Sequence, residues 1–190
     1  MMGLNSLPDM ELYWSNDPFY NNKEISQVMT IKRFKKITEN LHINNNEEEP
    51  RRDSPNYDKL FKLRPMITEL NKKNSEEMYN SSQQSIDECM VKFKGRSSHK
   101  QYIMPKKPIK HGFKVWARCD AKTGYLYKFE VYTGKGDSIE EEGLGYNIVN
   151  KLSLDLPENT LLAFDNFFTG CNILEALYNR KNFCYRDCKT

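Results

Sequence analysis

The sequence predicts an α/β (α+β) protein in which a small helical domain, residues 1–80, precedes a mixed β-sheet built from residues 81–190. Apolar residues recur at helical spacing before residue 80, and strand-like alternation begins after Ser81. Further along, strand and helix patterns alternate, so the expected order is strand, strand, strand, helix, strand, helix. A chain of 190 residues is long enough for one ordinary domain with a small helical extension.

Two helices are expected in the N-terminal domain. In the first, Thr30 can act as the N-cap, and apolar residues recur near helical spacing between Ile31 and Leu41. Residues 44–56 are polar throughout and are predicted to form a loop. The second helix is expected over residues 58–73, where Pro65 indicates that the helix either starts near the proline or kinks there.

The clearest element of the predicted sheet is a hairpin. Residues 113–119 and 125–132 alternate between apolar and polar side chains, and the turn at 121–124 joins them. Further strands are expected at 86–93, 160–168 and within 182–186, and helices at 144–152 and 172–180. Ribonuclease-H-like nucleases and transposases share this order, so we expect a ribonuclease-H-like mixed sheet.

Positive charge is concentrated in one part of the chain. The net charge is only +3, but nine Lys or Arg residues and no Asp or Glu lie between Val91 and Arg118. Such a block suits a polyanionic partner such as nucleic acid, and the alternative is a solvated basic face. The residues expected to contact DNA phosphates are Lys94, Arg96, Lys100, Lys106, Lys107 and Lys110.

Several classes of protein are disfavoured by what the sequence lacks. No stretch approaches the roughly 18 apolar residues of a membrane span, so no membrane partner is expected. The five cysteines form no C-x-x-C pair, which argues against a disulfide framework or a zinc knuckle and favours reduced thiols inside the cell. No nucleoside-triphosphatase, serine-hydrolase or zincin motif occurs.

Two short apolar runs each carry an aspartate. Asp87 lies early in the first expected strand, and Asp165 lies late in the fourth. An acid in such a run is costly unless something compensates its charge, and a divalent metal is one such compensator. Neighbouring strands would let both carboxylates converge on Mg²⁺ ions that stabilise phosphoryl transfer. The alternative is that each aspartate is a solvated strand-end residue. Strand alternation places Glu88 on the opposite face from Asp87.

A series of short motifs extends along nearly the whole chain in a fixed order. They are Tyr13-Trp14-Ser15, Tyr57-Asp58-Lys59-Leu60, Ser85-Ile86-Asp87-Glu88, Phe93-Lys94-Gly95-Arg96-Ser97-Ser98, Pro105-Lys106-Lys107-Pro108, Gly112-Phe113-Lys114-Val115-Trp116, Tyr132-Thr133-Gly134-Lys135 and Phe164-Asp165-Asn166-Phe167-Phe168-Thr169. In these motifs the sequence resembles the piggyBac transposase family, in particular the piggyBac-element-derived proteins of animals.

The resemblance implies a ribonuclease-H-like core that performs metal-dependent DNA transposition through three aspartates. Asp87 matches the first of these catalytic and metal-binding residues, and Asp165 matches the second. The third lies further downstream in the family than Thr190, so the chain resembles a truncated copy that neither cuts nor joins DNA by itself. The other expectations are Mg²⁺ as cofactor, a nuclear location, DNA as partner (a transposon end or any sequence) and a homodimer as one candidate assembly.

Two alternatives to a transposase-derived protein of this kind stay open. The first is a domesticated, non-catalytic module that binds DNA or protein and is retained for its basic face. The second is a product that does not fold stably, because the sheet lacks the family's later elements.

Overall fold

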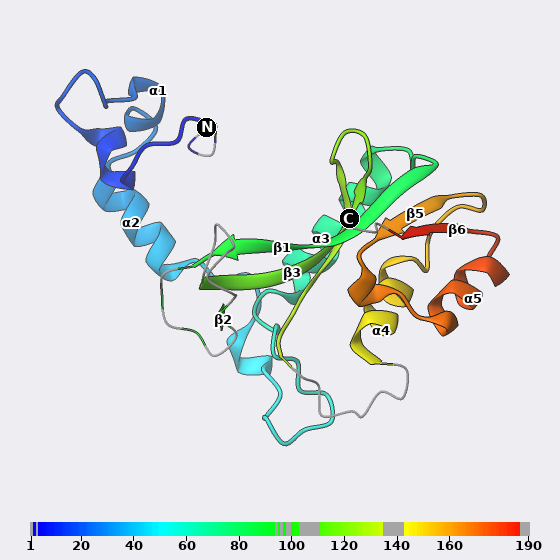
Figure 1. The fold of residues 1–190 in the computed structure, drawn as a ribbon. Coiled ribbons are helices and arrows are strands. Elements are labelled where there is room, and N and C mark those ends of the chain that lie inside the picture. Colours follow the sequence, from blue (N-terminus) through cyan, green and yellow to red (C-terminus); the bar gives the residue numbers. More distant parts are fainter. Residues whose placement is uncertain are drawn as a thin grey trace. The chain divides into compact units, whose positions relative to one another are not determined.

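The structure is a computed structural model that describes residues 2, 4–93, 95, 97, 100–102, 111–134 and 143–186. The contacts within the chain group it into two compact units, Met1–Glu49 and Pro50–Thr190. The division predicted from the sequence, at residue 80, stays a prediction. The fold of each unit is described by itself below, and both are drawn in Figure 1.

The first unit consists of short helices that begin at polar capping residues. The four are η1 (Met10–Trp14), α1 (Lys23–Ser26), α2 (Ile31–Asn40) and η2 (Asn46–Glu48). The side chain of Thr30 accepts a hydrogen bond from the backbone of Arg33, which confirms the predicted cap of α2. The Trp14 ring packs on Phe34 at 5.4 Å between centroids, so η1 and α2 share an aromatic contact.

The second unit begins with turns that lead into α3 (Arg64–Glu77). Pro65 lies in the first turn of α3, where backbone N–H groups have no partner within the helix, so the missing N–H of proline costs nothing. Of the two predicted alternatives, the proline therefore marks the start of the helix and not a kink. The helix therefore begins later than the expected residue 58. The Asn71 side chain both donates to the carbonyl of Phe129 (2.9 Å) and accepts from its amide (2.8 Å), which fixes α3 against a sheet strand.

The sheet of the second unit has mixed pairing, with β1 at its centre. Its strands are β1 (Gln83–Lys92), β2 (Gln101–Tyr102), β3 (His111–Asp120), β4 (Leu126–Val131), β5 (Leu161–Phe164) and β6 (Phe183–Arg186). They lie in the order β2-β3-β1-β5-β6, with β4 also pairing with β3. β1 runs antiparallel to β3 and parallel to β5, and β5 runs parallel to β6.

Two details of the sheet differ from the sequence-based expectation. The short strand β2 lies within the basic stretch between Val91 and Arg118, at a place where no strand is predicted, and pairs with the start of β3. The strand expected over residues 160–168 ends at Phe164 and is followed by a 3-10 turn, η3 (Asn166–Phe168). An apolar run does not by itself distinguish a continued strand from a short helical turn, because either one can bury large apolar side chains.

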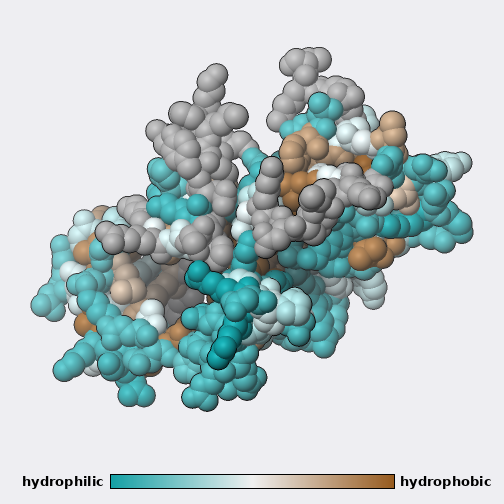
Figure 2. All heavy atoms as spheres, turned by 90° about the horizontal axis from the view of Figure 1, so that it is seen from below, coloured by the Kyte–Doolittle hydropathy of each residue, from teal (hydrophilic) through white to brown (hydrophobic). Residues whose placement is uncertain are grey.

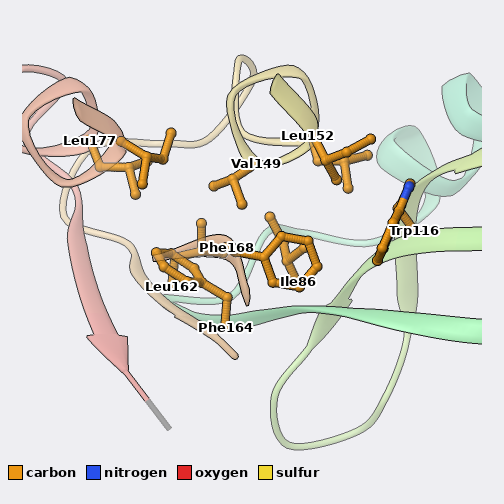
Figure 3. Close-up of a cluster of buried hydrophobic side chains, with 10 residues drawn as sticks. Ile86, Trp116, Val149, Leu152, Leu162, Phe164, Phe168 and Leu177 are labelled. Carbon is orange, nitrogen blue, oxygen red and sulfur yellow. The ribbon is translucent and has the colours of Figure 1, made fainter. Parts of the chain in front are cut away.

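Helices α4 (Gly143–Leu152) and α5 (Cys171–Asn179) cover one side of β5 and β6, as Figure 1 shows. The core of the second unit lies between these helices and the sheet. It is formed by Ile86, Trp116, Ile148, Val149, Leu152, Leu162, Phe164, Phe168, Ile173 and Leu177. Figure 3 shows Leu177, Val149 and Leu152 pointing from the helices toward the sheet, and Trp116 at the end of the cluster far from Leu177.

The sequence is polar on average, and so is the face of the molecule seen in Figure 2. Figure 2 shows a face that is mostly hydrophilic, on which hydrophobic residues form separate patches. Mean hydropathy is −0.80, in keeping with this view. Within the described parts of the chain, no helix combines the length and the apolar character that crossing a bilayer requires.

Candidate metal and DNA site

The two predicted aspartates lie side by side at the ends of the paired stretch of two parallel strands. In the β1–β5 pairing the last matched positions are Ile86 and Phe164. Asp87 follows the first of these residues and Asp165 follows the second. Because adjacent strands lie about 4.8 Å apart, the backbones that carry the two carboxylates are immediate neighbours. Two aspartates 78 positions apart in the sequence, at 87 and 165, are therefore brought close together by one strand pairing.

Each carboxylate is oriented by the backbone that follows it. Asp87 Oδ1 accepts a hydrogen bond from the Glu88 amide at 2.7 Å, and Asp165 Oδ1 accepts one from the Asn166 amide at 2.6 Å. The second contact also caps η3, so Asp165 is both a site residue and the start of a turn. Asp87 is exposed and Asp165 is half-buried, which leaves the site open to a solvated ligand.

The residues present fit a hard divalent cation. Mg²⁺ prefers oxygen ligands and is commonly held by one or two carboxylates, with waters and substrate phosphates completing its shell. Asp87 and Asp165 supply such a pair. Among the described residues, no group of three or more His, Cys, Asp or Glu side chains is placed to hold a metal. The described residues therefore offer two carboxylates on neighbouring backbones, and a metal between them stays a proposal.

Two thiols near the site have raised pKa values. Burial raises the pKa of Cys89, and the negative charge of Asp87 raises it further. Burial also raises the pKa of Cys119 on the neighbouring strand. A hard cation such as Mg²⁺ takes oxygen ligands, so the carboxylates and not these thiols are the donors that suit it.

A charged and aromatic cluster, not foreseen from the sequence, lies at the same two segments. Lys114 Nζ lies 2.6 Å from Glu88 Oε2 and 4.0 Å from the centroid of the Trp116 ring. The Trp116 ring stacks on Phe167 at 5.9 Å with 10° between the planes. Alternation along β3 places Lys114 and Trp116 on one face, which is a signal in the sequence, but their partners on β1 and η3 follow only from the strand pairing.

The predicted DNA-contacting residues are only partly described. Lys100 is half-buried, and its Nζ donates to the carbonyl of Gly95 at 3.3 Å. The remaining residues lie outside the described ones: Lys94, Arg96, Lys106, Lys107 and Lys110. Their role in binding DNA stays a prediction.

The pairing of β1 with β3 and β5, under the helices α4 and α5, defines a mixed sheet of the ribonuclease-H-like class, as the sequence predicted. The profile of the family described as Transposase IS4 matches residues 1–185, and the chain belongs to this family. The relatives to which the chain is similar are of the piggyBac type, which confirms the resemblance seen in the motifs.

Two of the similar human proteins are PiggyBac transposable element-derived proteins. Protein 3 is 35% identical over 185 residues, and protein 2 is 27% identical over 191 residues; each alignment covers 93% of this chain and 30% of the relative. A solved structure titled "Cryo-EM structure of piggyBac transposase synaptic complex with hairpin DNA (SNHP)" superposes with a TM-score of 0.77 at 23% identity. It covers 93% of this chain and 37% of that one. The chain thus spans less than a third of the length of PiggyBac transposable element-derived proteins 3 and 2.

Proposed function

We propose that this transposase-derived chain binds DNA and holds Mg²⁺ between Asp87 and Asp165. The observation that carries the proposal is the β1–β5 register, in which Asp87 and Asp165 directly follow the last matched pair, Ile86 and Phe164. Carboxylates on neighbouring backbones repel each other, and a cation between them would relieve this repulsion. The negative charge of a polyanionic partner beside them would need the same compensation. A DNA phosphate approaching this site therefore favours a bound divalent cation.

In this proposal the chain's own residues position the ligands. The Glu88 and Asn166 amides hold one oxygen of each carboxylate, and η3 fixes the direction of the second segment. When bound, Mg²⁺ would supply charge neutralisation and polarisation of a phosphate oxygen. The family's metal-dependent chemistry supports this choice of cation.

DNA binding is proposed from charge. The stretch between Val91 and Arg118 carries nine cationic side chains without one acidic residue, and Asp87 lies just before it. Contacts of this kind bind phosphates and give affinity without reading base sequence. The solved relative in complex with hairpin DNA supports the choice of partner. We also propose that the chain resides in the nucleus, where its DNA partner is found, and a homodimer is a further proposal.

Fluorescence anisotropy with a labelled duplex oligonucleotide tests DNA binding. We expect the affinity for DNA to fall steeply with salt. A plot of the logarithm of the association constant against the logarithm of the salt concentration should have a slope of about −0.9 for each phosphate contact. Changing Lys100, Lys106 and Lys107 together to Gln should weaken binding and flatten this slope. Changing the exposed Lys72, Lys122 and Lys181 to Gln removes the same charge from elsewhere and should have little effect. Equal losses in both triple variants, or no binding at low salt, would contradict the proposal.

A cleavage assay on the same duplex tests activity. We expect no Mg²⁺-dependent cutting or joining, because two carboxylates supply only part of a two-metal site. Cutting or joining that is lost in Asp87→Ala would overturn this expectation. The alternative function, a non-catalytic binding module, predicts DNA affinity that is the same with Mg²⁺ or EDTA and is unchanged in Asp87→Asn and Asp165→Asn.

A further inference from the structure

The Lys114 ammonium group lies at the meeting point of four elements of the second unit. Its Nζ pairs with Glu88 on β1 and lies over Trp116 on its own strand, β3. It also lies 6.0 Å from the ring of Tyr132, just after β4, and 5.9 Å from the ring of Phe167 in η3. The Lys114 and Glu88 side chains are only 21% and 20% exposed, so solvent weakens their attraction less than at an open surface.

Two of the contacted residues belong to the segments that carry the aspartates. Glu88 directly follows Asp87, and its amide is the donor to the Asp87 carboxylate. Phe167 lies two residues after Asp165, within the 3-10 turn that the Asp165 carboxylate caps. One lysine side chain thus contacts both aspartate-bearing segments without being bonded in sequence to either.

The Phe167 ring depends on this cluster for its position. It is 58% exposed, and it is held by stacking on Trp116 and by the edge of Phe168 at 5.1 Å. Lysine over aromatic faces adds an electrostatic attraction that is directional, because the ring faces carry negative charge density. Removing the ammonium group therefore loosens both the Glu88 side and the Phe167 side of the cluster.

We propose that Lys114 is a positioning residue that sets the relative placement of Asp87 and Asp165 for a divalent cation. The inference rests on the proposed metal site. Lys114 is not itself a ligand, and alternation places it with Glu88 on the strand face opposite the Asp87 side chain. Partners that orient metal ligands in this way commonly change metal affinity by about 10- to 100-fold when they are removed.

Mn²⁺ affinity, measured by electron paramagnetic resonance of the free ion, tests the proposal. Lys114→Met keeps the length of the side chain and removes its charge, and we expect Mn²⁺ affinity to fall by about tenfold. Lys114→Arg keeps the charge and should restore most of the affinity. Lys151→Met removes another lysine of the same unit, which pairs with Glu130 at 3.0 Å, and serves as the matched control with unchanged affinity.

The outcomes separate this inference from the proposed function. If the unchanged protein does not bind Mn²⁺, the proposed metal site fails. If it binds Mn²⁺ and Lys114→Met binds equally well, the metal site stands and the positioning role is overturned. Should Lys114→Met fail to fold, Phe167→Leu tests the same cluster at an exposed position. That variant should lower Mn²⁺ affinity and shift the Asn166 amide resonance, and unchanged affinity in it would equally overturn the role.

Discussion

Asp87 and Asp165 each follow one member of the last matched pair of β1 and β5, Ile86 and Phe164, and each carboxylate accepts a hydrogen bond from the next backbone amide. The register that sets the hydrophobic core therefore also sets the distance between the two acids. Ile86 and Phe164 are both buried in that core, so a slip in the pairing would remove apolar side chains from it. The core thus protects the geometry of the site.

In the proposed site, two neighbouring carboxylates repel each other when no cation is bound. We expect Asp87→Asn to raise the free energy of unfolding by about 0.2–1 kcal/mol in EDTA, because it removes a like-charge pair between neighbouring strands. Mg²⁺ should stabilise the unchanged protein and not the variant. Urea unfolding with and without Mg²⁺ measures both effects. The exposed Asp53→Asn should change neither, and a loss of stability for Asp87→Asn in EDTA would contradict the expectation.

Gly145 lets α4 approach the turn that follows Asp165. A Cβ at this position would lie 2.7 Å from the Phe167 carbonyl oxygen and 3.2 Å from Phe168 Cα, so helix and turn would have to separate. We expect Gly145→Ala to cost about 1–3 kcal/mol of unfolding free energy and to shift the Asn166 amide resonance. In Gly170→Ala the added Cβ meets nothing within 4 Å, and the cost should be about 0.5 kcal/mol from weaker helix capping. Equal effects of both substitutions in urea unfolding would refute the close-approach argument.

Arg118 is a fully buried cation with one anionic partner. Its Nη2 donates to Asp155 at 2.9 Å, and burial lowers the pKa of the guanidinium group while Asp155 raises it. Neither Nε nor Nη1 of Arg118 has a hydrogen-bond partner among the described residues. Asp155→Ala should therefore destabilise the protein by about 3–5 kcal/mol, because it leaves a buried charge without its counter-ion.

The matched control for this prediction is Glu158→Ala. Glu158 pairs with Lys181 at 3.0 Å, but both side chains are largely exposed, and such pairs contribute about 0–1 kcal/mol. Thermal and urea unfolding of the two variants give the comparison. Similar small losses in both would mean that Arg118 finds adequate compensation without Asp155.

Asp120 gives the hairpin turn a pH dependence. Hydrogen bonds from the Ser81 hydroxyl and then from the Thr123 hydroxyl and amide lower the pKa of Asp120 from 3.8 to about 2. A carboxylate whose pKa is lowered in the folded state contributes stability above pH 3.8, and this contribution is lost as pH falls toward 2. We expect Asp120→Asn to be less stable than the unchanged protein at pH 6 and to approach it near pH 2. A difference that stays constant across this range would contradict the assignment.

Much of the fold follows from local patterns in the sequence. Alternation over residues 113–119 and 125–132 predicts the β3–β4 hairpin, and Thr30 predicts the start of α2, because both signals depend on neighbouring residues. The start of α3 was less well defined. Pro65 allows either a helix start or a kink, and the structure shows that the helix begins at Arg64 with the proline in its first turn.

The site was predictable in part. Both aspartates stand out as acids in apolar runs, and the order of strands makes them neighbours, but their exact register depends on lateral pairing between distant segments. The contacts of Lys114 with Glu88 and Phe167 join three separate parts of the chain, so no local pattern could reveal them. Such contacts belong to tertiary structure alone.

The central claim, a divalent cation held between Asp87 and Asp165, is tested most directly by paramagnetic broadening of backbone amide resonances. Sub-stoichiometric Mn²⁺ should first broaden the amides of Glu88 and Asn166, excess Mg²⁺ should reverse the broadening, and Asp87→Asn should abolish it. Broadening that appears first at other acidic stretches, such as Glu47–Glu49, or that leaves the Glu88 and Asn166 amides sharp, would contradict the claim.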